Sequence, residues 1–92
     1  MIIVTYMVGS LSAINAIAGA YAEDLPVLIV TGGPNNHDRE CCHLVHHTLG
    51  EVDFYLSSKC FEHVTAGSFC VRYYNEAASK TKLWCCAFLL EH

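Results

Sequence analysis

Residues 4–34 read VTYMVGSLSAINAIAGAYAEDLPVLIVTGGP, and this stretch decides the fold. Residues 2–8 begin with β-branched and aromatic side chains, which is typical of a strand buried on both faces of a parallel sheet. Residues 26–31 are a second short apolar strand, and apolar residues recur at helical spacing over 10–23. The order strand, helix, strand predicts two neighbouring parallel strands joined by a helix.

The flanking residues predict where these elements begin and end. Ser10 is a plausible N-cap for the helix, and the residue before a proline leaves helical geometry, so the helix should stop before Pro26. Residues 31–36 then form a loop at the carboxyl end of a strand, where ligands bind in open α/β sheets. Residues 61–66 are a weaker strand candidate, and Asn75 can cap a last helix whose apolar face runs to residue 90.

Composition restricts the class of protein. A chain of 92 residues allows one small domain, and its 53% apolar and 15% charged content is typical of a buried segment rather than a well-solvated domain. The net charge of −4 gives no reason to expect nucleic acid or an anionic membrane as partner.

The uncharged start of the chain raises two further possibilities. Residues 1–22 carry no charge and are long enough for a membrane span or a signal peptide. Polar residues are spread through this segment, and no Lys or Arg precedes Arg39, so the basic flank that either structure would need is missing. A buried βαβ unit is the better interpretation.

The cysteines and histidines leave alternatives open. Six cysteines at positions 41, 42, 60, 70, 85 and 86 could form a disulfide framework, but two adjacent pairs and no CxxC favour free thiols. A metal site is a second possibility, because a helix over 41–47 would pair Cys42 with His46, and His43 with His47, at zinc-ligand spacing. Adjacent cysteines are a poor chelating arrangement, and no second motif closes such a site.

Three segments carry a family resemblance: SLSAINAIAGAYAEDLPV at 10–27, GGPN at 32–35 and HHTLG at 46–50, and CFEHVT at 60–65 is a fourth, weaker one. They resemble the thiamine-diphosphate-dependent 2-oxo-acid decarboxylases, above all the pyruvate decarboxylases. The resemblance implies an α/β fold, a partial parallel sheet with flanking helices. Residues 1–92 would then be part of the family's N-terminal pyrimidine-binding domain, lacking an upstream glutamate segment and the last strand.

The resemblance also implies site residues. Two consecutive histidines line the family's active site and take part in proton transfer, so His46 and His47 are the candidate catalytic residues; imidazole suits this work because its pKa lies near neutrality. Thr5, Val8 and Gly9 correspond to the strand-to-helix turn that packs beside the cofactor's aminopyrimidine ring. Without the resemblance, these would be two solvated loop histidines and an ordinary turn.

The implied activity is non-oxidative decarboxylation of pyruvate to acetaldehyde and carbon dioxide in the cytoplasm, with thiamine diphosphate and magnesium as cofactors. A homologous subunit is an expected partner; nucleic acid and membrane are not. Residues 39–45 replace a small, glycine-containing run of the family with bulkier and charged residues. Because the activating glutamate and a Gly-Asp-Gly diphosphate motif are missing, we expect the isolated chain to be inactive. The alternative is a small Cys/His metal-binding or interaction protein without catalytic activity.

Overall fold

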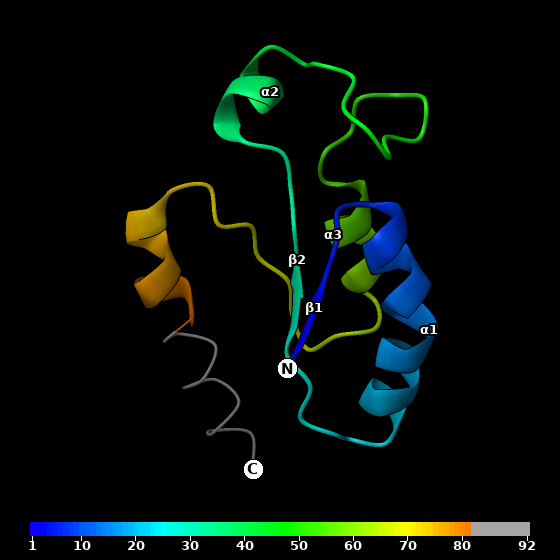
Figure 1. The fold of residues 1–92 in the computed structure, drawn as a ribbon. Helices are drawn as coiled ribbons and strands as arrows, with labels where there is room; N and C mark the ends of the chain where they lie inside the picture. The colour runs from blue at the N-terminus through cyan, green and yellow to red at the C-terminus, as the bar shows by residue number, and fades with distance from the viewer. Residues whose placement is uncertain (82–92) are drawn as a thin grey trace.

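The computed structural model describes residues 1–81 as an α/β arrangement, shown in Figure 1. Its elements in chain order are β1 (Ile2–Val4), α1 (Val8–Ala22), β2 (Ile29–Thr31), α2 (Asn36–Glu40) and α3 (Leu56–Phe61). Residues 74–81 form a further helical segment.

The two strands form a parallel sheet, in which Ile3 of β1 lies opposite Val30 of β2. Helix α1 connects them, so the predicted βαβ unit is confirmed. Each strand has only three residues, fewer than the sequence suggested. Parallel pairing of the two strands brings their carboxyl ends to the same edge of the sheet.

Helix α1 begins two residues before the predicted N-cap. Met7 is the N-cap residue and is buried beneath the first turn. The Ser10 side chain is fully buried inside the helix, where its hydroxyl donates a hydrogen bond to the Met7 carbonyl oxygen at 2.6 Å. The Ser10 prediction was therefore wrong, because this hydroxyl bonds back to a carbonyl oxygen and caps no free N–H group.

The end of α1 agrees with the prediction that it stops before Pro26. Asp24 adopts a positive φ of 54°, and the Leu25 N–H donates to the Ala20 carbonyl oxygen at 2.9 Å. This left-handed residue and backward hydrogen bond are typical of a helix C-terminus. The chain thus reverses towards β2 before it reaches the proline.

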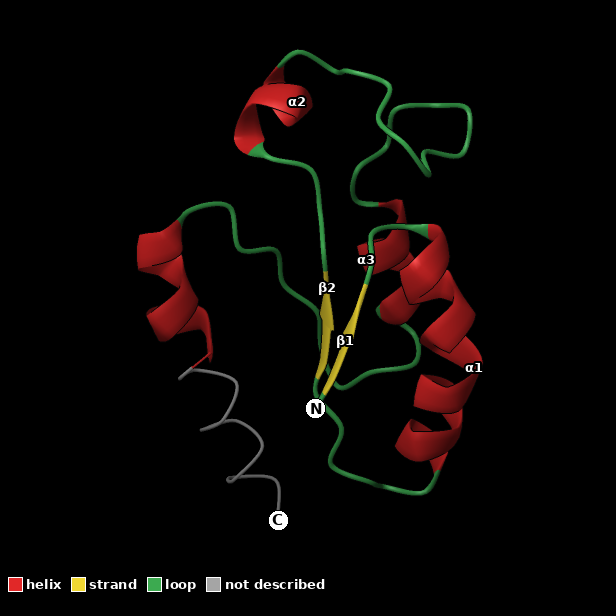
Figure 2. Ribbon diagram, in the orientation of Figure 1, coloured by secondary structure: helices red, strands yellow, loops and turns green. Residues whose placement is uncertain are grey.

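The core is small and lies between α1, α3 and one face of the sheet (Figure 2). Within residues 1–81, its buried apolar side chains are Met7, Ile17, Phe54 and Phe61. Ile3 and Val30, which are paired across the sheet, remain 70% and 42% exposed. The expected burial of the first strand on both faces was therefore wrong for the described residues, because α1 and α3 cover one face.

Two predictions for the second half of the chain also need correction. Residues 61–66 form no strand: Phe61 ends α3 in the core, and the chain then turns, with the Thr65 hydroxyl donating to the Phe61 carbonyl oxygen at 2.7 Å. The last helix begins at residue 74, so Asn75 lies within its first turn and does not cap it. Its predicted extension to residue 90 lies outside the described residues.

The membrane interpretation of the uncharged start can be compared with the helices. Among residues 1–81, no helix is both long and apolar enough to cross a membrane. Residues 1–22 instead contain a short strand followed by a helix of 15 residues.

Candidate active site

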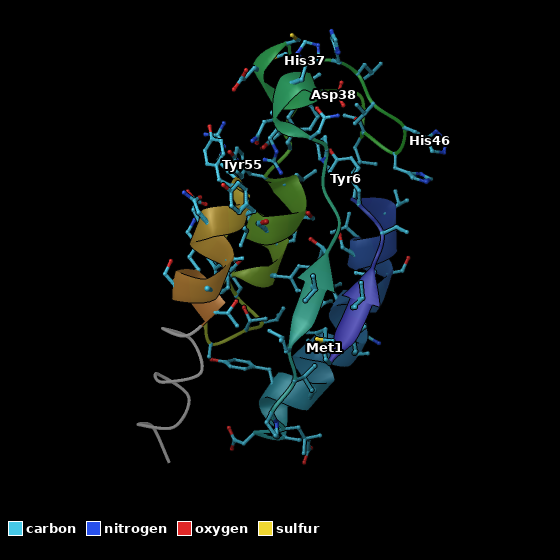
Figure 3. All side chains as sticks on the ribbon, turned by 60° about the vertical axis from the view of Figure 1, so that its left-hand side comes forward. Met1, Tyr6, His37, Asp38, His46 and Tyr55 are labelled. Atoms are coloured by element: carbon cyan, nitrogen blue, oxygen red, sulfur yellow. The ribbon has the colours of Figure 1, made fainter. Side chains whose placement is uncertain are left out.

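A hollow of about 450 Å³ opens at the carboxyl ends of the two parallel strands. It is lined by Tyr6, Gly33, Pro34, Asn35, Asp38, Val45 and His46. Figure 3 shows Tyr6, Asp38 and His46 at this end of the sheet, with Met1 at the opposite end. The loop after β2 and the turn after β1 therefore meet a histidine that is far away in sequence.

The two histidines are the central residues of a tight turn. The N–H and hydroxyl of Thr48 both donate to the Val45 carbonyl oxygen, at 3.2 and 2.6 Å, and so close the turn. His47 has a positive φ of 71°, as the third residue of a type II turn requires. The ring centroids of His46 and His47 are 3.9 Å apart, so the turn presents both exposed imidazoles as one unit.

Helix α2 forms the opposite wall and is fixed by its own first residues. The Asn35 side chain accepts a hydrogen bond from the Asp38 N–H at 2.9 Å, which caps the helix. The Arg39 Nε donates to the Pro34 carbonyl oxygen at 3.2 Å, and its guanidinium lies over the Tyr55 ring, 5.2 Å from the centroid. These contacts hold the loop after β2 against the segment that precedes α3.

Tyr6 is a residue of the hollow that the sequence analysis missed. Within residues 1–81, its hydroxyl is buried without a hydrogen-bond partner, and its ring lies 6.5 Å from that of Phe54. Buried polar atoms are nearly always paired, so an unpaired hydroxyl in a hollow suits a ligand with a polar ring atom. The available signal was its position, an aromatic residue in the turn after β1, two residues beyond Val4.

The predicted cofactor residues lie beside the hollow but do not line it. Thr5 and Val8 are exposed and flank Tyr6 and Met7 in the turn between β1 and α1. A Cβ atom at Gly9 would collide with the Thr5 side chain, so a larger residue here needs Thr5 to move. Of the predicted site residues, only His46 shares the hollow with Tyr6.

The zinc interpretation loses its geometric basis. Helix α2 ends at Glu40, so residues 41–47 do not form the helix that would pair Cys42 with His46. His43 instead lies 3.2 Å from the Asp38 carboxylate. Over the part of the chain that the structure describes, no three His, Cys, Asp or Glu side chains are grouped to hold a metal ion.

An ion pair with shifted pKa values lies at the start of α3. The Lys59 ammonium donates to the Asp53 carboxylate at 2.7 Å, and the Tyr55 N–H donates to the same carboxylate at 3.0 Å. The first contact, more than the second, lowers the pKa of Asp53, and the same ion pair raises the pKa of Lys59. The carboxylate thus organises the turn that places Phe54 and Tyr55 near the hollow.

Comparison with known proteins finds similarity to several pyruvate decarboxylases. The chain is 45% identical to pyruvate decarboxylase 3 of Arabidopsis thaliana over 75 residues, 82% of this chain and 13% of that protein. It is 51% identical to pyruvate decarboxylase 2 of Nicotiana tabacum over 63 residues, and 52% identical to pyruvate decarboxylase 2 of Oryza sativa over 62. These alignments cover 68% and 67% of the chain, but 10% of each relative. The chain thus spans a small part of the relatives it matches.

The family model for the N-terminal TPP binding domain of thiamine pyrophosphate enzymes matches residues 1–57. This range includes the βαβ unit, α2 and the histidine turn, and therefore every residue that lines the hollow. From this match and the similarity to pyruvate decarboxylases, we conclude that the chain belongs to the thiamine pyrophosphate enzyme family, close to pyruvate decarboxylase.

Proposed function

We propose that this chain forms part of the pyrimidine-binding region of a pyruvate decarboxylase, in which His46 and His47 move protons during reaction of a 2-oxo acid. The observation that carries the proposal is the hollow, where His46 lies with Tyr6 and the Gly33–Asn35 loop at the carboxyl ends of parallel strands. This edge is the usual ligand side of an open α/β sheet. The similarity to proteins named pyruvate decarboxylases supports the substrate, pyruvate.

The residues present fit the flat ring of the cofactor better than its charged end. A mostly apolar hollow with one unpaired hydroxyl suits an aminopyrimidine, with Tyr6 as hydrogen-bond partner and the turn of Thr5, Val8 and Gly9 beside it. When bound, thiamine diphosphate supplies the nucleophilic ring carbon and the electron sink for decarboxylation. His46 and His47 are exposed, so their imidazoles can bind the substrate carboxylate and exchange protons with water.

The magnesium and diphosphate contacts are proposed to come from elsewhere in the enzyme, including a homologous subunit. The 92 residues contain no Gly-Asp-Gly run, and they match 13% of the length of the Arabidopsis relative. Most of the lowering of a reaction barrier comes from positioning and fixed charges around the reacting group. We therefore expect the 92-residue chain, tested alone, to bind the cofactor weakly and to produce no acetaldehyde from pyruvate.

Two measurements test this proposal. Histidine NMR signals of the purified chain are followed during titration with thiamine diphosphate and magnesium, and acetaldehyde is assayed after pyruvate is added. We expect the His46 signals to shift without turnover, while His63, which lies outside the hollow, stays unchanged and serves as the internal control. Unchanged His46 signals at saturating cofactor would contradict the binding site.

A chimera tests the catalytic role separately. The matching segment of the Arabidopsis relative is replaced by this chain, and acetaldehyde formation is compared with that of the same chimera carrying His46→Ala and His47→Ala. We expect a drop of roughly a hundredfold or more, the typical contribution of positioned acid–base groups. A chimera that is active regardless of both histidines would refute their role in proton transfer.

A further inference from the structure

Two adjacent cysteines at the end of α2 are unused by the proposed function. Cys41 is the C-cap residue of α2, and Cys42 follows it with a positive φ of 51°. Both are free thiols with exposed side chains, whereas Cys60 and Cys70 are half-buried. A reagent in solution therefore reaches a pair of thiols at one point of the surface.

A histidine lies against the first of these thiols. The Cys41 Sγ is 3.8 Å from Nδ1 and 3.9 Å from Nε2 of His37, which precedes it by one helical turn. An imidazole at this distance can accept the thiol proton and leave a thiolate, the nucleophilic form of cysteine. Cys41 is thus the thiol of the pair with a base beside it.

The base is held in place by two further side chains. The His37 ring meets the His43 ring edge-on, with centroids 5.6 Å apart and an interplanar angle of 85°. His43 in turn lies 3.2 Å from the Asp38 carboxylate. Figure 3 shows His37 and Asp38 together on α2. Asp38 and His43 thereby position His37 against Cys41.

Within the described residues 1–81, the second thiol has no such base. The Cys42 Sγ donates to the Arg39 carbonyl oxygen at 3.7 Å, a contact that leaves the sulfur exposed. Its neighbour in the chain is within reach, because consecutive Cα atoms are about 3.8 Å apart. Cys42 is therefore suited to attack a sulfur atom already attached to Cys41.

We propose that Cys41 and Cys42 form a dithiol reaction site for small disulfides and trivalent arsenicals. Cys41 transfers its proton to His37, and its sulfur attacks one sulfur of a disulfide such as oxidised glutathione. A Cys41–glutathione bond forms, the original S–S bond breaks, and one glutathione leaves with a proton. Cys42 then attacks the Cys41 sulfur, forms the Cys41–Cys42 disulfide and releases the second glutathione. The protein loses two electrons and two protons, and the oxidant gains them.

Local geometry makes this oxidation easy to reverse. Disulfides favour Cα atoms about 5.5–6 Å apart, more than neighbouring residues allow, so a bond between Cys41 and Cys42 is strained. Strained and exposed disulfides are the readily reduced ones. An arsenical reacts with both thiols without oxidation: two As–S bonds form, and the arsenic-bound oxygen leaves as water.

The test uses the full chain, in which trypsin separates the cysteines. Cleavage after Arg39, Lys59, Arg72 and Lys82 places Cys41 and Cys42 in peptide 40–59, Cys60 and Cys70 in peptide 60–72, and Cys85 and Cys86 in peptide 83–92. The native chain is treated briefly with excess oxidised glutathione, quenched in acid, alkylated, digested and analysed by mass spectrometry. A parallel sample receives phenylarsine oxide before alkylation.

We expect peptide 40–59 to lose two hydrogens, to escape alkylation and to recover both thiols with dithiothreitol, while peptide 60–72 stays alkylated at both cysteines. In the Cys42→Ser variant, the mixed disulfide should accumulate on Cys41. His37→Asn should slow the first step roughly tenfold, because a thiol without a base is only about a few per cent thiolate at pH 7, and His63→Asn should leave the rate unchanged.

Two results would overturn the proposal. One is peptide 40–59 with both thiols still free when peptide 60–72 has begun to react. The other is an equal rate for both peptides in the native chain and in urea, which would mean that the fold contributes nothing. A variant that has lost its fold is recognised by its circular dichroism, and the Cys42→Ser trapping experiment then decides.

Discussion

Gly9 shows how contact with one neighbouring side chain can favour glycine. A Cβ atom at Gly9 would meet the Thr5 side chain, whereas a Cβ atom at Gly19, in the same helix, would meet nothing within 4 Å. We expect Gly9→Ala to lower the free energy of unfolding by about 1–3 kcal/mol through overpacking. Gly19→Ala should raise it by about 0.5–1 kcal/mol through better helix propensity. Urea unfolding measures both, and a neutral Gly9→Ala would contradict the clash.

His47 carries backbone strain at the candidate site. Its φ of 71° is unfavourable for a side chain with a Cβ atom, whereas His46 is not among the residues with positive φ. We expect His47→Gly to raise the free energy of unfolding by up to about 1 kcal/mol and His46→Gly to lower it by a similar amount. Thermal unfolding of the two variants checks this. An equal loss of stability in both variants would argue against strain at His47.

At the scale of elements, the start of α3 depends on an ion pair. The lowered pKa of Asp53 means that its contribution to stability is present above its ordinary value of 3.8 and is lost as the pH falls through the lowered value. The raised pKa of Lys59 means that its contribution is present below 10.5 and is lost as the pH rises through the raised value. Between these limits, Asp53→Asn should destabilise the chain by an amount that does not vary with pH.

The measurement is urea unfolding of the wild-type chain and Asp53→Asn from acid to alkaline pH. The difference in free energy of unfolding between the two proteins should disappear at a pH well below 3.8 and shrink above 10.5. High salt should reduce it, because both side chains are at least 40% exposed and surface pairs are screened. A difference that persists in strong acid would show that the ion pair is not its source.

At the scale of the whole molecule, few side chains of residues 1–81 are buried, and the stability of this part depends on them. Phe61 is 4% exposed and Tyr74 is 95% exposed, so Tyr74 is the exposed aromatic control for the buried Phe61. Phe61→Ala should lower the free energy of unfolding by about 3–5 kcal/mol, a large part of the total stability of a small domain. Tyr74→Ala should change stability by no more than about 0.5 kcal/mol. Urea unfolding of both variants, followed by near-ultraviolet circular dichroism, measures their stability. Similar losses of stability in the two variants would mean that Phe61 is not part of the core.

Much of the first third of the fold follows from the sequence, because its signals are local. The apolar runs on either side of residues 10–23 predicted two parallel strands and a helix, and the structure confirms them as β1, α1 and β2. The Ser10 cap and the strand at 61–66 failed, since burial of Ser10 and Phe61 in the core outweighed their local preferences.

The candidate site was likewise predicted from the sequence only in part. The family resemblance predicted His46 and His47 as a pair, and the sequence alone supplies the turn residues that surround them. Only the tertiary structure brings Tyr6 and the Gly33–Asn35 loop to His46, because residues 40 positions apart meet at one edge of the sheet. Only the tertiary structure likewise shows that the sheet face at Ile3 and Val30 is left exposed. Periodicity predicts which residues are apolar, but only packing decides which of them are covered.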